Sequence, residues 1–182
     1  LFPYTTLFRS NFKEGDKISV KADGQDAVTY QLNNNEWQPQ GGKFLKWESE
    51  TMNFTAYYPA TFNGTINQPT EYNSLESLAA ADFMSFTGNV TNSGDNSLTL
   101  TMNRLMARVV VEIAGFNDQY TTDATVNSLS ICGIKAYKHT DNKFYALIKP
   151  CTAQNSATFI SLDVAEGESK TIEKLTGIPE LT

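Results

Sequence analysis

The stretch that decides the fold is Met52-Asn-Phe-Thr-Ala-Tyr-Tyr-Pro59. Apolar residues occupy every second position, which is the pattern of a strand that buries one face. Met52, Phe54 and Ala56 share that face, and Pro59 ends the strand because proline has no amide hydrogen to donate to a neighbour. The sequence therefore predicts a β-strand here, with a sheet core on one side of it.

Short alternating runs recur along the rest of the chain, separated by turn-rich segments. They predict strands over residues 17–22, 28–32, 44–47, 98–102, 103–113, 129–137, 144–148, 159–164 and 170–175. Residues 33–36 (Asn-Asn-Asn-Glu) predict a tight turn before Trp37, and residues 61–81 predict a long surface connection with one short helical segment. Three consecutive valines exclude a helix in the 103–113 run, because β-branched residues are poor helix formers. The chain is therefore predicted to be all-β.

The composition argues against binding to nucleic acids or to anionic membranes. The 182 residues carry 14 basic and 20 acidic side chains, a net charge of −6, and no basic cluster. Nucleic-acid binding requires a positive surface, so it is not expected. An anionic membrane surface is disfavoured for the same reason. No apolar run approaches the ~20 residues that a membrane-spanning helix needs.

Motifs in the first half of the chain resemble those of one family. Residues 15–20 (Gly-Asp-Lys-Ile-Ser-Val) are similar to a Gly-Asp-x-Ile-x-Val opening, and Trp37 and Trp47 precede a strand that ends in Tyr-Tyr-Pro. Residues 82–84 (Asp-Phe-Met) are similar to an Asp-(Leu/Phe)-Met motif. In this order and spacing they resemble the fimbrillin family, the surface lipoproteins and pilus subunits of Bacteroidales.

Later motifs extend this resemblance. Arg104, Ala107 and Arg108 are similar to the family's (His/Arg)-x-x-Ala-(Lys/Arg) strand. Residues 146–150 (Ala-Leu-Ile-Lys-Pro) resemble an Ala-Ile-(Val/Ile)-x-Pro-Gln segment, with Cys151 in place of Gln. The resemblance implies two tandem Greek-key, transthyretin-like β-sandwich domains. We expect residues 11–115 to form the first and residues 116–182 the second, with the boundary near residues 115–125.

Both ends of the sequence carry an expectation of their own. Residues 1–10 (Leu-Phe-Pro-Tyr-Thr-Thr-Leu-Phe-Arg-Ser) match the translation of a common sequencing-adapter oligonucleotide, so we treat them as an artefact and not as native sequence. Removing Arg9 leaves 13 basic against 20 acidic residues, a net charge of −7. Family members end in a Tyr-rich strand, so we expect the second domain to lack its last strand and the chain to be a fragment open at both ends.

The chain has two cysteines, Cys132 and Cys151. If Asp141 and Asn142 form a two-residue loop, Thr140 pairs with Lys143 and the register places the cysteines opposite each other. A disulfide is then possible, provided that the Cα atoms lie within about 7 Å. A four-residue loop shifts the register and leaves both as small thiols of the core.

No catalytic or metal motif is apparent. The one histidine, His139, falls in a predicted turn, so a triad or a multi-histidine metal site is not expected. Asp23, Asp26 and residues 33–36 place oxygen ligands close together, but their spacing misses the calcium-loop pattern, and solvated turns are the favoured interpretation. The same holds for the glutamate pairs 48/50 and 166/168 as candidate glycosidase carboxylates. No cofactor is expected.

Exposed aromatic rings could stack on sugars, although sandwich core and rim positions explain them more simply. The candidates are Trp37, Trp47, Tyr57, Tyr58 and Tyr137. The resemblance implies a non-enzymatic pilus subunit or adhesin that assembles by donor-strand addition with other fimbrial subunits. It also implies a lipid anchor on the missing N-terminal part and a location at the cell surface, on the outer membrane or in the fimbrium. A surface lipoprotein that binds glycans is the alternative, and a host protein or glycan is a possible further partner.

Overall fold

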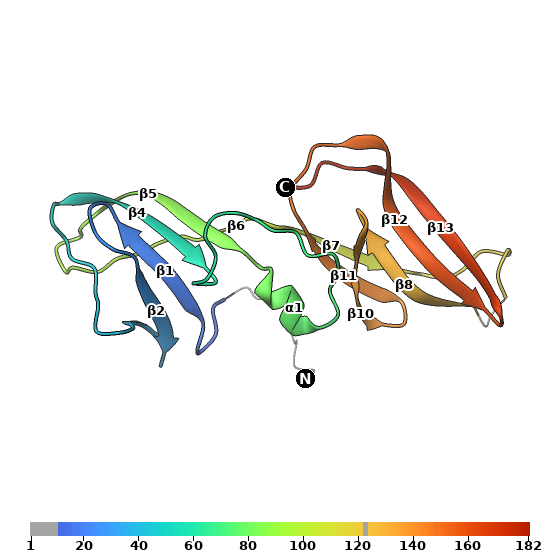
Figure 1. Cartoon of the computed structure of the whole chain (residues 1–182), viewed down its shortest axis with the longest axis horizontal. Coiled ribbons are helices and arrows are strands. Elements are labelled where there is room, and N and C mark those ends of the chain that lie inside the picture. The colour runs from blue at the N-terminus through green and yellow to red at the C-terminus, as the bar shows by residue number, and fades with distance from the viewer. Residues whose placement is uncertain (1–10, 122–123) are drawn as a thin grey trace. The chain divides into compact units, whose positions relative to one another are not determined.

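A computed structural model describes residues 11–121 and 124–182, so the adapter-like segment lies outside the described residues. Strands make up nearly all of the regular structure, with one short helix, α1 (Leu75–Ala80), among them (Figure 1). The all-β prediction is confirmed. The chain divides into two compact units, and each is discontinuous in sequence. Unit 1 contains residues 11–66 and 82–105, and unit 2 contains residues 67–81 and 106–182.

Unit 1 is built on one antiparallel sheet with the strand order β3-β2-β1-β4-β5-β6. Its strands are β1 (Lys17–Ala22), β2 (Val28–Asn33), β3 (Glu36–Pro39), β4 (Thr51–Tyr58), β5 (Met84–Thr91) and β6 (Asn103–Arg104). The turn between β2 and β3 is formed by Asn34 and Asn35, with φ angles of 51° and 63°. Asparagine tolerates this left-handed conformation, so the predicted tight turn is confirmed and joins a hairpin.

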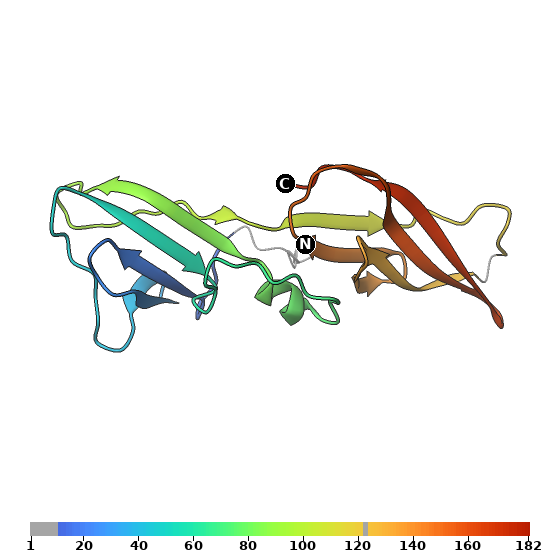
Figure 2. The same ribbon diagram turned by 45° about the horizontal axis from the view of Figure 1, so that its top comes forward.

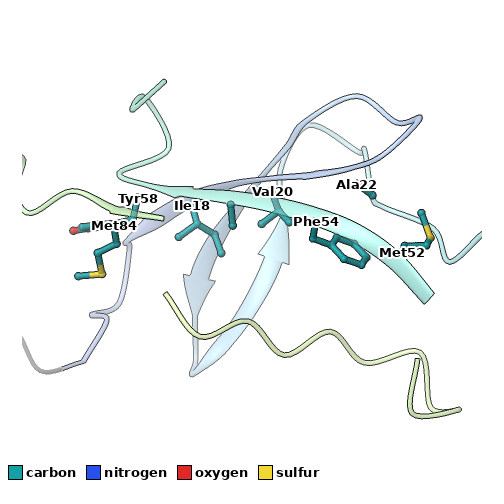
Figure 3. Packing of buried hydrophobic residues seen from close by; sticks show 8 residues of the cluster. Ile18, Val20, Ala22, Met52, Phe54, Tyr58 and Met84 are labelled. Carbon is teal, nitrogen blue, oxygen red and sulfur yellow. The ribbon is translucent and has the colours of Figure 1, made fainter. Parts of the chain in front are cut away.

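Strand β4 lies in the middle of this sheet and shows the predicted alternation. Met52, Phe54, Ala56 and Tyr58 are buried, whereas the residues between them are half-exposed on the opposite face. The buried side chains meet those of the neighbouring strands in one cluster (Figure 3). Its members are Ile18, Val20, Ala22, Met52, Phe54, Ala56, Tyr58 and Met84. The apolar side of β4 is therefore the core side of the sheet.

Two segments predicted as strands cover this core without joining a sheet. Residues 44–47 and 98–102 are extended but form no ladder, so both strand predictions are wrong. In the second segment Leu98, Leu100 and Met102 are half-buried and pack on the core, while the threonines between them are exposed. Covering a sheet imposes the same two-residue period as pairing within one, which is why the sequence pattern misled.

Unit 2 contains two sheets, with the orders β10-β11-β7 and β13-β12-β8-β9 (Figure 2). The strands are β7 (Ala107–Glu112), β8 (Thr125–Ile131), β9 (Ile134–Lys135), β10 (Tyr137–Thr140), β11 (Lys143–Ile148), β12 (Gln154–Glu166) and β13 (Ser169–Ile178). The predicted strand over residues 129–137 is interrupted by a turn at Cys132 and Gly133, whose φ angles are 51° and 79°. This turn forms a hairpin between β8 and β9, and the chain passes to the other sheet after β9, at Ala136.

The predicted domain boundary near residues 115–125 does not match this division. The run 103–113 forms two strands, β6 in unit 1 and β7 in unit 2, with the change of unit after Leu105. Strand β7 pairs along its whole length with β11, from Ala107 opposite Ile148 to Glu112 opposite Lys143. The apolar positions change from even-numbered residues (Leu98, Leu100, Met102) to odd-numbered ones (Ala107, Val109, Val111) near this point, a shift that the prediction of one strand over residues 103–113 overlooked.

The long connection after β4 is a structural part of unit 2. We call residues 67–81, which include α1, the strap. Strand β10 begins opposite Tyr145, so the Leu147 carbonyl and the Lys149 N–H lie beyond its end. The strap supplies their partners: Tyr72 Oη and Gln68 Nε2 donate to the Leu147 carbonyl at 2.6 and 3.0 Å, and Gln68 Oε1 accepts from the Lys149 N–H at 2.6 Å. Buried backbone groups need such partners, so the strap completes the β11 edge.

We expect Tyr72 to titrate anomalously. Its side chain is 1% exposed, and burial raises the pKa of its hydroxyl to about 12. This pKa exceeds the unfolded value of 10.0, so the stability contributed by neutral Tyr72 is complete below pH 10 and is lost as the pH rises toward 12. An ultraviolet titration should include a tyrosine that ionises near pH 12, and Tyr72→Phe should remove that step. A Tyr72→Phe variant that keeps the late step would contradict this placement of Tyr72.

Candidate functional site

An apolar groove of about 700 Å³ lies on the core side of unit 1. Ile18, Val20 and Phe54 from the sheet contribute to its lining. Residues 44–47 and the segment that ends at Met102 also contribute. The lining consists of Phe12, Ile18, Val20, Tyr30, Trp37, Phe44, Leu45, Lys46, Trp47, Phe54, Asn96, Leu98, Leu100 and Met102.

Specific hydrogen bonds hold residues 45–47, which line this groove, in place. The Gln25 side chain donates to the Lys46 carbonyl at 2.7 Å and accepts from the Lys46 N–H at 2.9 Å. The Leu45 N–H donates to Tyr30 Oη at 3.2 Å, and Trp47 Nε1 donates to the Asn96 carbonyl at 3.4 Å. The two covering segments are thus joined at Trp47. Both covering segments are attached to unit 1 by a few side-chain hydrogen bonds and not by a continuous ladder. The groove is the space that they leave open over the core face of the sheet.

A free backbone edge belongs to the same sheet. Strand β6 pairs only with Met84 and Ser85 of β5. From Phe86 to Thr91, the side of β5 that faces away from β4 has no partner strand in the part of the chain that the structure describes. Unpaired N–H and C=O groups at such an edge can accept an added strand, whose apolar side chains would pack on the core. The arrangement is suited to binding an extended polypeptide.

The aromatic residues considered for sugar stacking do not gather on one platform. Trp37 and Trp47 are half-buried in the groove, where their rings pack edge-on against Phe12 and Phe54 at 5.1 and 5.2 Å. Tyr58 is buried in the same core, whereas Tyr57 lies on the opposite face of β4. Tyr137 belongs to unit 2. Rings engaged in core contacts offer little free face to a sugar, so this geometry disfavours the glycan interpretation.

His139 lies in strand β10 and not in a turn, because the loop contains only Asp141 and Asn142. Its exposed ring contacts Tyr145 edge-on at 5.5 Å. No group of three histidine, cysteine, aspartate or glutamate residues that could hold a metal occurs among the described residues. Asp23 and Asp26 are exposed in the loop between β1 and β2.

The candidate glycosidase glutamates lie in a loop and at a turn of the structure. Glu48 and Glu50 are exposed beside β4, and Glu168 is exposed in the turn after β12. Glu166 accepts a hydrogen bond from the Thr121 N–H, and hydrogen bonds from Thr121 lower the pKa of its carboxyl. A glycosidase acid needs a raised pKa, which is the opposite shift.

Both cysteines are free, half-buried thiols in the structure. The expected pairing of Thr140 with Lys143 is present, but the turn at Cys132 prevents the register from being extended as far as the cysteines. Burial raises the pKa of the Cys132 thiol, and nearby Cys151 adds to the rise. The disulfide remains a prediction.

One contact between two family-like motifs was not foreseen. Asp82, of the Asp-Phe-Met motif, is 6% exposed, and its carboxylate accepts hydrogen bonds from Arg104 Nε at 3.0 Å and Nη2 at 3.3 Å. The pair joins the start of the β5 segment to β6. The appearance of an acid and a base in two successive motifs was the only signal in the sequence.

Comparisons with known proteins agree with this architecture. The sequence profile of the fimbrillin-like family matches residues 5–173. No match was found among curated proteins. No helix in the described residues has the length and apolar character to cross a membrane.

Two solved structures share the fold. A fimbrial protein from Bacteroides ovatus ATCC 8483 has a TM-score of 0.56 and 18% identity, over 91% of this chain and 41% of that one. A candidate cell adhesion protein from Bacteroides thetaiotaomicron VPI-5482 has a TM-score of 0.50 and 17% identity, over 93% of this chain and 73% of that one. The chain therefore spans less than half of the first relative. Because the family profile covers nearly the whole sequence, the chain belongs to the fimbrillin-like family.

Proposed function

We propose that the chain is part of a cell-surface pilus subunit or adhesin that assembles by donor-strand addition. The observation that carries this proposal is the apolar groove of about 700 Å³ in unit 1, which lies on a sheet with a free β5 edge. Its occupant would be an extended strand from another fimbrial subunit. The fimbrial and cell adhesion neighbours support this role, and a lipid anchor on the N-terminal side would hold the protein at the outer membrane or in the fimbrium.

The energetics suit a durable fibre. Backbone groups at the β5 edge would gain partners from the donor strand. Each apolar side chain that becomes fully buried contributes roughly 1.5–3 kcal/mol, so about four of them give on the order of 6–12 kcal/mol before ordering costs. Apolar burial needs no chemistry from the groove, which is consistent with a structural and adhesive role rather than a catalytic one.

The groove can be blocked with one charge. Leu100 lines it, whereas neighbouring Thr99 is exposed on the same segment. We expect Leu100→Lys to place an ammonium group against the apolar lining and to abolish assembly, because an unpaired charge is costly to bury. Thr99→Lys adds the same charge on the solvent side and should assemble normally. The measurement is the ladder of oligomers from the mature protein on unheated denaturing gels.

Two results would count against the proposal. The first is a mature wild-type protein that forms no ladder and sediments as a monomer at high concentration. The second is a Leu100→Lys variant that assembles as well as Thr99→Lys. Circular dichroism of both variants separates a blocked groove from a failure to fold.

A further inference from the structure

Lys46 is the one charged side chain among the described residues that line the groove. Its backbone is fixed, because the Gln25 side chain donates to its carbonyl at 2.7 Å and accepts from its N–H at 2.9 Å. Its ammonium group lies over the Phe44 ring, 5.7 Å from the ring centre, where the face of the ring attracts a cation. Lys46 itself is exposed, so its charge lies at the rim of the groove.

The Lys46 ammonium group has no carboxylate within 4.0 Å among the described residues. The ring beside it, that of Phe44, is 62% exposed. An occupant that covers this end of the groove therefore removes water from both the ring and the ammonium group. Burying an unpaired charge is costly, and a hydrogen bond to a carboxylate offsets that cost. An occupant that brings a carboxylate to this position is favoured over one that does not.

We propose that the occupant of the groove is an extended segment with an aspartate or glutamate side chain beside Lys46. The inference rests on the proposed function, because this segment is the donor strand of another fimbrial subunit. Its alternate apolar side chains enter the groove, and its carboxylate accepts a hydrogen bond from the Lys46 ammonium group at the rim. Lys46 is then the residue that selects among donor strands.

Charge complementarity supplies a selectivity that the apolar lining lacks. Any segment with alternating apolar side chains can fill an apolar groove, so burial alone discriminates little between strands. One charged contact favours a partner of opposite charge and disfavours a partner of like charge. Subunits with the composition of this chain suit the role, since it has 20 acidic against 14 basic side chains.

The test compares the binding of two blocked peptides to the whole chain: acetyl-Glu-Val-Thr-Val-Thr-Val-amide and the same peptide with Gln in place of Glu. Trp37 and Trp47 line the groove, and the peptides contain no aromatic residue, so tryptophan fluorescence measures binding. We expect the glutamate peptide to bind about tenfold more tightly at low salt, with a smaller difference at high salt. A second pair of peptides, with the Glu or Gln last, covers the opposite strand direction.

Variants of two lysines on one segment assign this preference to its residue. Lys46→Met keeps the length of the side chain and removes the charge, so it should bind the glutamate and glutamine peptides equally. Lys46→Glu should favour a peptide with lysine in place of glutamate. Lys43→Met makes the same change at an exposed residue outside the lining and should keep the tenfold preference.

Three results would overturn the role of Lys46. The first is a wild-type chain that binds the glutamate and glutamine peptides equally, and the second is a preference that survives in Lys46→Met. The third is a glutamine peptide with a free C-terminus that binds as tightly as the blocked glutamate peptide, because the carboxylate recognised is then a chain end and not a side chain.

Failure of the groove itself gives a different result. Leu100→Lys should bind none of the peptides, because its charge blocks the apolar lining. A wild-type chain that binds no peptide, or a Leu100→Lys variant that binds them as well as the wild type, contradicts both the donor-strand groove and the role of Lys46. Equal binding of the glutamate and glutamine peptides by the wild type contradicts the role of Lys46 alone.

Discussion

Alanine in place of Phe54 is expected to lower the free energy of unfolding of unit 1 by about 3–5 kcal/mol. Phe54 is 2% exposed at the centre of the core face, and its ring contacts that of Trp47 edge-on at 5.2 Å. The residue opposite it on β5 is Gly88. A glycine has no side chain to move into the space, so the cavity left by the phenylalanine should remain largely open.

Urea denaturation followed by tryptophan fluorescence measures this loss, because both tryptophans belong to unit 1. Thr55→Ala is the matched control on the other face of β4, where we expect a change within about 0.5 kcal/mol. A Phe54→Ala variant as stable as this control would show that the core face of β4 has been misassigned. The groove lining includes Phe54, so the variant should also assemble poorly.

The second large effect concerns the pair Asp82–Arg104. Arg104→Ala should cost about 3 kcal/mol, because it leaves the Asp82 carboxylate, 8% exposed, without its cationic partner. Asp82→Ala should cost less, about 1–2 kcal/mol, because the Arg104 side chain is 41% exposed and stays hydrated. The predicted order therefore follows from which charge remains buried.

Chemical denaturation of both single variants and of the double variant tests this order. The double variant should be more stable than Arg104→Ala, since it removes the stranded carboxylate together with the guanidinium. Equal losses for the two single variants would mean that the pair is effectively at the surface. In that case its contribution would fall to the small values typical of exposed ion pairs.

The core of unit 1 could be predicted because burial of one strand face leaves a local mark. Met52, Phe54 and Ala56 repeat every second residue, and this period depends only on the pleat of the strand. The same logic failed for Leu98 and Leu100, where a covering segment has the same period but no ladder. The local sequence pattern indicates which side chains face a core. It does not indicate which strand, if any, pairs with the backbone of that segment.

Long-range pairings were invisible for the same reason. Asp82 and Arg104 are 22 residues apart, and nothing between them indicates that they meet. The division between β6 and β7 depends on the partners of each strand, which lie far away in sequence. The groove is a space between two covering segments, so no single residue in the sequence could predict it.

The strap has a consequence for the order in which the protein matures. Tyr72 finds its hydrogen-bond acceptor in Leu147, 75 residues further along the chain. A polypeptide that is synthesised from its N-terminus therefore presents the strap long before β11 exists to receive it. Unit 1 can fold once residue 105 has been synthesised. Tyr72 and Leu78 remain hydrated until β11 has been synthesised. During this interval the strap is a stretch of chain without its partners that chaperones or proteases can reach, so the timing of folding bears on the yield of intact protein.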